Sequence, residues 1–217
     1  MSTGSGLEWL SRAAELQACP LCVAAREFER EYLREFCQSL AEPGQHVADF
    51  VRGPGFCLDH ARKLEQAVLR GNAPMPGSVD LYLRTLESLV DHMSALEQDE
   101  WLVTAQCPVC ANRDRMMVVA ARAFVAAVDR VPWVADETLR AGGLCIGHFV
   151  LTWVDSEEGA ARRFLRDLQC HATADLIRHL RGLRDGGLCG EPDRQRELIA
   201  TWKRAARSVS GWTVTRR

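Results

Sequence analysis

Two sets of metal-ligand residues recur along this chain with the same internal spacing. Each set combines a Cys-Pro-x-Cys segment with a Cys-x-x-His segment, and thirty-four residues separate the two segments. The first set consists of Cys19, Cys22, Cys57 and His60, and the second of Cys107, Cys110, Cys145 and His148. Every member of the second set lies 88 positions after its counterpart in the first. Self-similarity at a fixed period indicates an internal duplication, and here the duplicated unit carries metal-ligand spacing.

The remaining cysteines and histidines provide an internal control, because none of them recurs at the same offset. Of nine cysteines and six histidines, only the two sets repeat together. We interpret Cys37 and Cys170 as core thiols on apolar helical stretches, and Cys189 as a free thiol in a glycine-rich loop. His171 follows Cys170 directly, but adjacent residues diverge by about 100° on a helix, so this pair is not predicted to bind a metal.

Apolar residues recur with helical spacing along most of the chain, for example at Phe28, Tyr32 and Phe36. The predicted helices cover residues 7–16, 22–40, 57–70, 78–96, 110–130, 133–140, 145–154, 157–184 and 192–207. No segment shows a convincing strand pattern, so the sequence predicts an all-α fold. We expect two tandem helical repeats packed as one domain, residues 1–98 and 99–190, each pinned by its own Cys3His site. Residues 191–217 would add a C-terminal helix and a basic tail.

The composition limits the classes of partner. With 47% apolar and 26% charged residues the chain is ordinary globular material, and its net charge of −2 argues against bulk electrostatic binding to nucleic acid. No apolar run is long enough to span a bilayer, and the N-terminal residues lack a basic-then-apolar secretory pattern. Paired cysteines without such a leader favour the reducing cytoplasm and metal ligation over disulfides.

Three thiolates and one imidazole are the ligands of a closed tetrahedral zinc site. A Cys-x-x-His segment at a helix start places both side chains on one face, since residues i and i+3 are neighbours there. If each Cys-Pro-x-Cys segment also opens a helix, two helix N-termini point at each ion and favour the thiolate form. The sequence therefore predicts two structural zinc ions, with each repeat supplying all four ligands of its own site.

These ligands leave the function open between different classes. The prediction we favour is a zinc-binding accessory or adaptor protein that acts on a protein partner through its surface, because the chain carries no recognisable catalytic motif. One alternative is an iron–sulfur protein, since Cys3His ligands can also hold a cluster. The other is thiol–disulfide chemistry at the Cys-Pro-x-Cys pairs, which would leave His60 and His148 without a role.

The pattern Cys-Pro-x-Cys…Gly-(Phe/Leu)-Cys-x-x-His, present twice with helical intervals, resembles an uncharacterised family of bacterial and archaeal proteins built from this duplicated unit. The match covers roughly residues 19 to 184 and includes all eight ligands. The resemblance implies a helical fold and metal binding, and it implies no assigned reaction.

Overall fold

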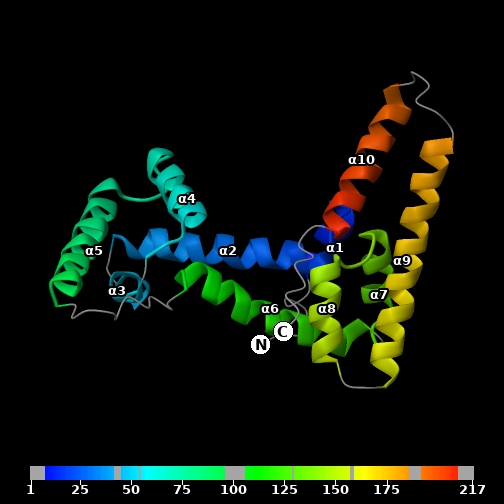
Figure 1. The fold of residues 1–217 in the computed structure, drawn as a ribbon, viewed down its shortest axis with the longest axis horizontal. Helices are drawn as coiled ribbons and strands as arrows, with labels where there is room; N and C mark the ends of the chain where they lie inside the picture. Colours follow the sequence, from blue (N-terminus) through cyan, green and yellow to red (C-terminus); the bar gives the residue numbers. More distant parts are fainter. Residues whose placement is uncertain are drawn as a thin grey trace. The chain divides into compact units, whose positions relative to one another are not determined.

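A computed structural model describes residues 8–41, 45–53, 55–95, 106–128, 130–156, 159–185 and 192–209. Within these ranges every regular element is an α-helix, which confirms the predicted all-α fold (Figure 1). The helices are α1 (Glu8–Glu15), α2 (Pro20–Ser39), α3 (Gln45–Arg52), α4 (Leu58–Leu69), α5 (Met75–Ala95), α6 (Pro108–Val128), α7 (Pro132–Arg140), α8 (Ile146–Asp155), α9 (Ala160–Asp185) and α10 (Pro192–Val209). None of the helices in these ranges is long and apolar enough to cross a membrane.

The chain forms two compact units that do not follow the expected repeat boundaries. Unit 1 comprises residues 1–26 and 117–217, and unit 2 comprises residues 27–116. Both boundaries fall inside a helix, the first in α2 and the second in α6. The units therefore group residues differently from the predicted repeats 1–98 and 99–190, and the C-terminal helix α10 belongs to unit 1.

The helix starts agree with the sequence patterns. Prolines occupy the first position of α2, α6, α7 and α10, where the missing N–H has no helical partner to lose. α2 and α6 begin 88 residues apart, as do α4 and α8. This shared offset is the one seen in the ligands, while the duplication itself stays a prediction. Helix α3, by contrast, was not predicted from the sequence.

The core of unit 2 is a group of aromatic rings that fixes the start of α4. Phe36 of α2 and Phe50 of α3 are fully buried, and both contact Phe56, with ring centroids 4.7 Å from that of Phe56. Val109, at the start of α6, is also fully buried in this core. The same apolar cluster thus holds the beginnings of α4 and α6, which carry cysteines and a histidine.

The core of unit 1 fixes the start of α8. Helix α1 packs on α7, and α7 and α8 both contact α9. The Gln169 side chain of α9 accepts a hydrogen bond from Leu144 N and donates one to Leu144 O, both at 2.9 Å. These two hydrogen bonds hold the backbone of the residue directly before Cys145.

Both Cys-x-x-His segments follow a glycine in the left-handed region, Gly55 with φ +71° and Gly143 with φ +82°. The two positions differ in what surrounds them. A Cβ on Gly143 would lie 2.8 Å from Ala172 Cβ on α9, whereas a Cβ on Gly55 would make ordinary contact with the Phe50 ring at 3.5 Å. Gly143 is therefore needed for both conformation and space, and Gly55 for conformation alone.

We predict that Gly143→Ala lowers the free energy of unfolding by about 3 kcal/mol, because left-handed strain adds to overpacking. The matched variant Gly55→Ala should lose only about 1–2 kcal/mol, the strain alone. Urea unfolding of both variants with saturating Zn²⁺ measures the difference. Equal losses in the two variants would contradict the close approach of α9 to Gly143.

Candidate metal centres

The eight predicted ligands gather into two groups of four, but each group draws on both predicted repeats. One group, in unit 1, is Cys19, Cys22, Cys145 and His148, and the other, in unit 2, is Cys57, His60, Cys107 and Cys110. Within each group the ligand atoms all lie within 4.8 Å of one another. Each centre therefore combines the Cys-Pro-x-Cys of one repeat with the Cys-x-x-His of the other.

The prediction that each repeat closes its own site is wrong. Helix α2 carries Cys22 near its start, while His60 lies beside Glu29, seven positions further along the same helix. At a rise of about 1.5 Å per residue, seven positions correspond to about 10 Å, which is too far for two ligands of one ion. The burial of Val109 in the core of unit 2 brings Cys107 and Cys110 to His60 instead.

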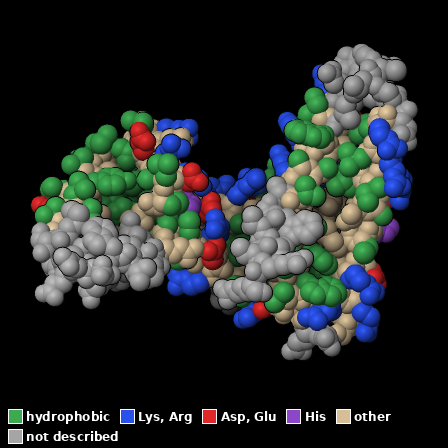
Figure 2. All heavy atoms as spheres, viewed as in Figure 1, with side chains coloured by type: hydrophobic (Ala, Val, Ile, Leu, Met, Phe, Trp, Pro, Cys, Tyr) green, Lys and Arg blue, Asp and Glu red, His purple; other side chains and the backbone are tan. Residues whose placement is uncertain are grey.

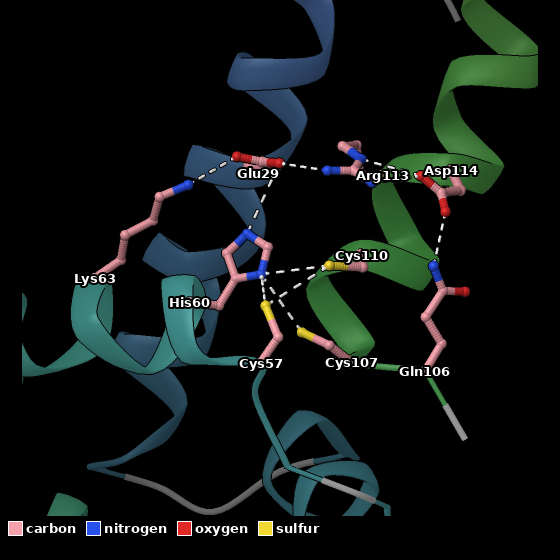
Figure 3. A network of polar contacts seen from close by, with 9 residues as sticks. All are labelled: Glu29, Cys57, His60, Lys63, Gln106, Cys107, Cys110, Arg113 and Asp114. Atoms are coloured by element: carbon pink, nitrogen blue, oxygen red, sulfur yellow. Dashed lines mark hydrogen bonds and ion pairs between the residues drawn. The ribbon is translucent and has the colours of Figure 1, made fainter. Parts of the chain in front are cut away.

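In the unit 2 centre, the ring nitrogen His60 Nδ1 faces three sulfurs (Figure 3). The distances from Nδ1 are 3.1 Å to Cys57 Sγ, 3.4 Å to Cys107 Sγ and 3.5 Å to Cys110 Sγ. Cys57 Sγ lies 3.9 Å from Cys110 Sγ. His60 and Cys107 are buried, whereas Cys57 is the most exposed ligand of the four.

The unit 1 centre has nearly the same dimensions. His148 Nδ1 lies 3.2 Å from Cys145 Sγ, 3.3 Å from Cys22 Sγ and 3.5 Å from Cys19 Sγ. Cys22 Sγ and Cys145 Sγ are 3.7 Å apart. Both centres thus use the Nδ1 atom of the histidine.

These distances fit a single tetrahedral ion. With Zn–S bonds of about 2.3 Å and a Zn–N bond of about 2.0–2.1 Å, neighbouring ligands lie about 3.8 Å apart for two sulfurs and about 3.5 Å apart for sulfur and nitrogen. The S···S distances of 3.7 and 3.9 Å match the first value, and the S···N distances of 3.1–3.5 Å approach the second. The residues present therefore fit a four-coordinate metal ion in each unit.

The local backbone explains how each pair converges. Cys57 and Cys145 are the N-cap residues of α4 and α8, both with extended backbone, and the histidine follows three residues later on the same face. Cys107 directly precedes α6, as Cys19 precedes α2. Two helix N-termini therefore meet at each centre, as predicted, and their dipoles favour the thiolate form of the ligands.

The titration of the thiols reflects their crowding. In unit 1, burial raises the pKa of Cys19, whereas hydrogen bonds from the Cys19 and Cys22 thiols lower the pKa of Cys145. Burial opposes the charge on His148, but contacts with Cys145 and Cys22 outweigh it and raise the pKa of His148 to about 9. In unit 2, burial and the neighbouring Cys107 raise the pKa of Cys110 to about 12. Three thiols this close do not all ionise by themselves, so binding of a divalent cation must release protons.

The two centres differ beyond their ligands. In unit 2, Glu29 Oε1 lies 3.7 Å from His60 Nε2, on the side of the ring away from the sulfurs (Figure 3). The Glu29 carboxylate lies 2.9 Å from Lys63 Nζ and 3.0 Å from Arg113 Nη1. Burial opposes ionisation of Glu29, but hydrogen bonds from Lys63 and Arg113 outweigh it and lower its pKa. Glu29 is therefore a carboxylate at ion-pair distance from the candidate ligand His60, whose buried Nε2 makes no hydrogen bond within the described residues, and it can orient the imidazole ring.

Unit 1 has no such carboxylate at the corresponding position. Met117 lies 88 residues after Glu29, and Leu151 lies 88 residues after Lys63. Ala25 lies 88 residues before Arg113, so all three counterparts are apolar. Met117 is buried. Glu29 was not predicted from the sequence, because this carboxylate does not recur at the 88-residue offset that marks the ligands.

The remaining cysteines and histidines stay outside both centres where the structure describes them. Cys37 is buried, as predicted. The prediction of a core thiol is wrong for Cys170, which is exposed on α9. His171 lies 3.6 Å from the Asp175 carboxylate on the same helix. Cys189, predicted to be a free loop thiol, lies outside the described residues.

Comparison of the chain with protein-family models, with curated proteins and with solved structures gives no match. The resemblance to a family of duplicated Cys-Pro-x-Cys proteins therefore stays a prediction.

We predict that Glu29→Gln weakens metal binding at the unit 2 centre by about 10- to 100-fold, because His60 loses its charged partner. Competition with a chromophoric zinc chelator should then show one of two metal equivalents released more readily. Glu31→Gln is the matched control, since Glu31 lies on the same helix and pairs with Arg34 rather than with a ligand. Identical competition curves for the two variants would contradict the role of Glu29.

Proposed function

We propose that this protein is a zinc-binding helical accessory or adaptor protein, in which two closed Cys3His centres are structural and the surface acts on a protein partner. The observation that carries the proposal is the pair of four-ligand groups whose spacing fits one tetrahedral ion each. Three cysteines and one histidine are a common ligand set of structural zinc. Four protein ligands leave no open coordination position for a substrate water, which supports a structural role over zinc catalysis.

The ligand spacing also bears on the alternatives. A cluster distributes its ligands over two or four iron atoms, so the cysteines of one site are spread more widely than around a single ion. A disulfide needs a sulfur–sulfur distance of about 2.05 Å, and the close pairs here stand 3.7 and 3.9 Å apart. Both comparisons favour a single ion. Thiolate ligands also need a reducing compartment, and we therefore propose the cytoplasm as the location.

A metal ion that joins ligands from both predicted repeats stabilises the fold more than one that joins ligands within a single repeat. The unit 1 centre joins Cys22 to Cys145, 123 positions apart, whereas a site within one repeat would join residues only 35 apart. Since loop-closure entropy grows with the logarithm of loop length, the longer loop adds about 1 kcal/mol to the stabilisation. Each ion would hold together two segments that are far apart in the sequence.

The identity of the metal is tested by elemental analysis of the full chain purified without added metal. We expect about two equivalents of zinc per chain and a colourless protein. Iron together with inorganic sulfide would overturn the zinc proposal in favour of a cluster. A protein free of metal, with rapidly reacting thiols, would instead support thiol chemistry.

We further predict that removal of the metal by a strong chelator destabilises both units, because metal affinity contributes directly to folding free energy. Far-UV circular dichroism should show a lower melting temperature, and added Zn²⁺ but not Mg²⁺ should restore it, since Mg²⁺ prefers oxygen ligands. An unchanged melting temperature after complete metal loss would argue against a structural role.

A further inference from the structure

Helices α4 and α5 of unit 2 form a groove of about 460 Å³ with an almost entirely apolar lining. Its walls include Leu64 and Val68 from α4 and Val79, Leu83 and Leu86 from α5. Figure 2 shows hydrophobic side chains gathered over these two helices. The apolar lining distinguishes this groove from an active-site cleft, which needs placed polar groups.

The face around the groove exposes many large apolar side chains to solvent. Nine large apolar side chains of α4 and α5 are 41–72% exposed. The seven that make up this face are Leu69, Met75, Val79, Tyr82, Leu83, Leu86 and Leu89. Together they present on the order of 800 Å² of surface, about what each partner buries in an interface of standard size. Contiguous apolar patches above a few hundred Å² mark interaction sites on folded proteins.

Helix α9 of unit 1 shows that this apolar face is not required by the helical packing itself. When the buried positions of the two helices are aligned, Ser78 and Leu81 of α5 match the buried Leu165 and Leu168 of α9, at an offset of 87 rather than the 88 that relates the two ligand sets. At the same offset, the exposed residues Val79, Leu83 and Leu86 correspond to Arg166, Cys170 and Thr173, which are all exposed. A helix with equivalent buried positions thus carries an arginine, a cysteine and a threonine where α5 carries three large aliphatic side chains.

We propose that the α4–α5 face, defined by the seven residues above, is a homodimer interface that binds the same face of a second copy of this chain. Closed two-fold dimers are the commonest assemblies of soluble proteins, and their interfaces use the same patch on both subunits. An apolar patch is complementary to itself without charge matching, and its size reaches that of a stable interface. The inference goes beyond the proposed function and does not depend on the identity of the metal.

The test is the oligomeric state of the zinc-replete full chain, measured by sedimentation equilibrium and light scattering. Interfaces of this size have micromolar or tighter affinity, so the parent chain should be dimeric at about 10 μM. Leu83→Glu combined with Leu86→Glu should weaken self-association more than 100-fold, because each copy would bury two charges at the centre of the interface. Val79→Arg, which copies Arg166 of α9, should weaken it in the same direction.

Ile177→Glu is the matched control, since Ile177 is an exposed apolar residue on α9 and should leave the dimer unchanged. Metal content and circular dichroism of the same samples separate this inference from the proposed function. Variants that become monomeric while keeping their metal and helicity would support the interface. A parent chain that is monomeric at about 100 μM, or a Leu83→Glu/Leu86→Glu variant that stays dimeric, would overturn it.

Discussion

The thiolate and imidazole ligands of each centre come from two segments that are far apart in the chain. Each unit therefore depends on the two segments meeting at its centre. Unit 1 needs Cys19 and Cys22 from the beginning of the chain to complete the pair formed by Cys145 and His148. Unit 2 needs Cys107 and Cys110 in the same way. Neither four-ligand group is complete within residues 1–98 or within residues 99–190, so a chain divided there would contain only half-sites. Because non-local contacts form slowly, we expect metal binding to complete folding rather than to start it.

The two centres have the same types of ligand and differ in the residues around them. The unit 2 centre has a carboxylate behind its histidine, itself held by a lysine and an arginine. At the matching position of the other half stands a buried methionine. The α4–α5 face differs in the same way, since Val79, Leu83 and Leu86 of α5 correspond to Arg166, Cys170 and Thr173 of α9. A shared framework with unlike outer residues is what we would expect if the two halves had taken separate roles.

Residue spacing was sufficient to identify the eight residues that gather into two groups, and insufficient to predict which segments meet in each group. The eight ligands were identifiable because two Cys-Pro-x-Cys and two Cys-x-x-His segments recur at one offset, and the helix starts followed from prolines and periodicity. Spacing alone cannot say which Cys-Pro-x-Cys meets which Cys-x-x-His, because equal offsets fit both pairings. The length of α2 and the burial of Val109 decide that question, and both are properties of the folded chain. Helix α3 was missed because it begins at Gln45 without a proline at its first position, whereas its similarly short counterpart α7 begins at Pro132. Cys170 was misplaced because helical periodicity does not reveal which side of α9 is covered.

The measurement that tests the crossed ligand sets most directly is the zinc content of two double variants after equilibration with a moderate chelator. Cys57→Ser with Cys107→Ser removes two ligands of one centre, so this variant should retain about one zinc per chain. Cys19→Ser with Cys57→Ser removes one ligand from each centre and should retain almost none. The opposite result, with one zinc kept by the Cys19/Cys57 variant and none by the Cys57/Cys107 variant, would show that each repeat holds its own ion.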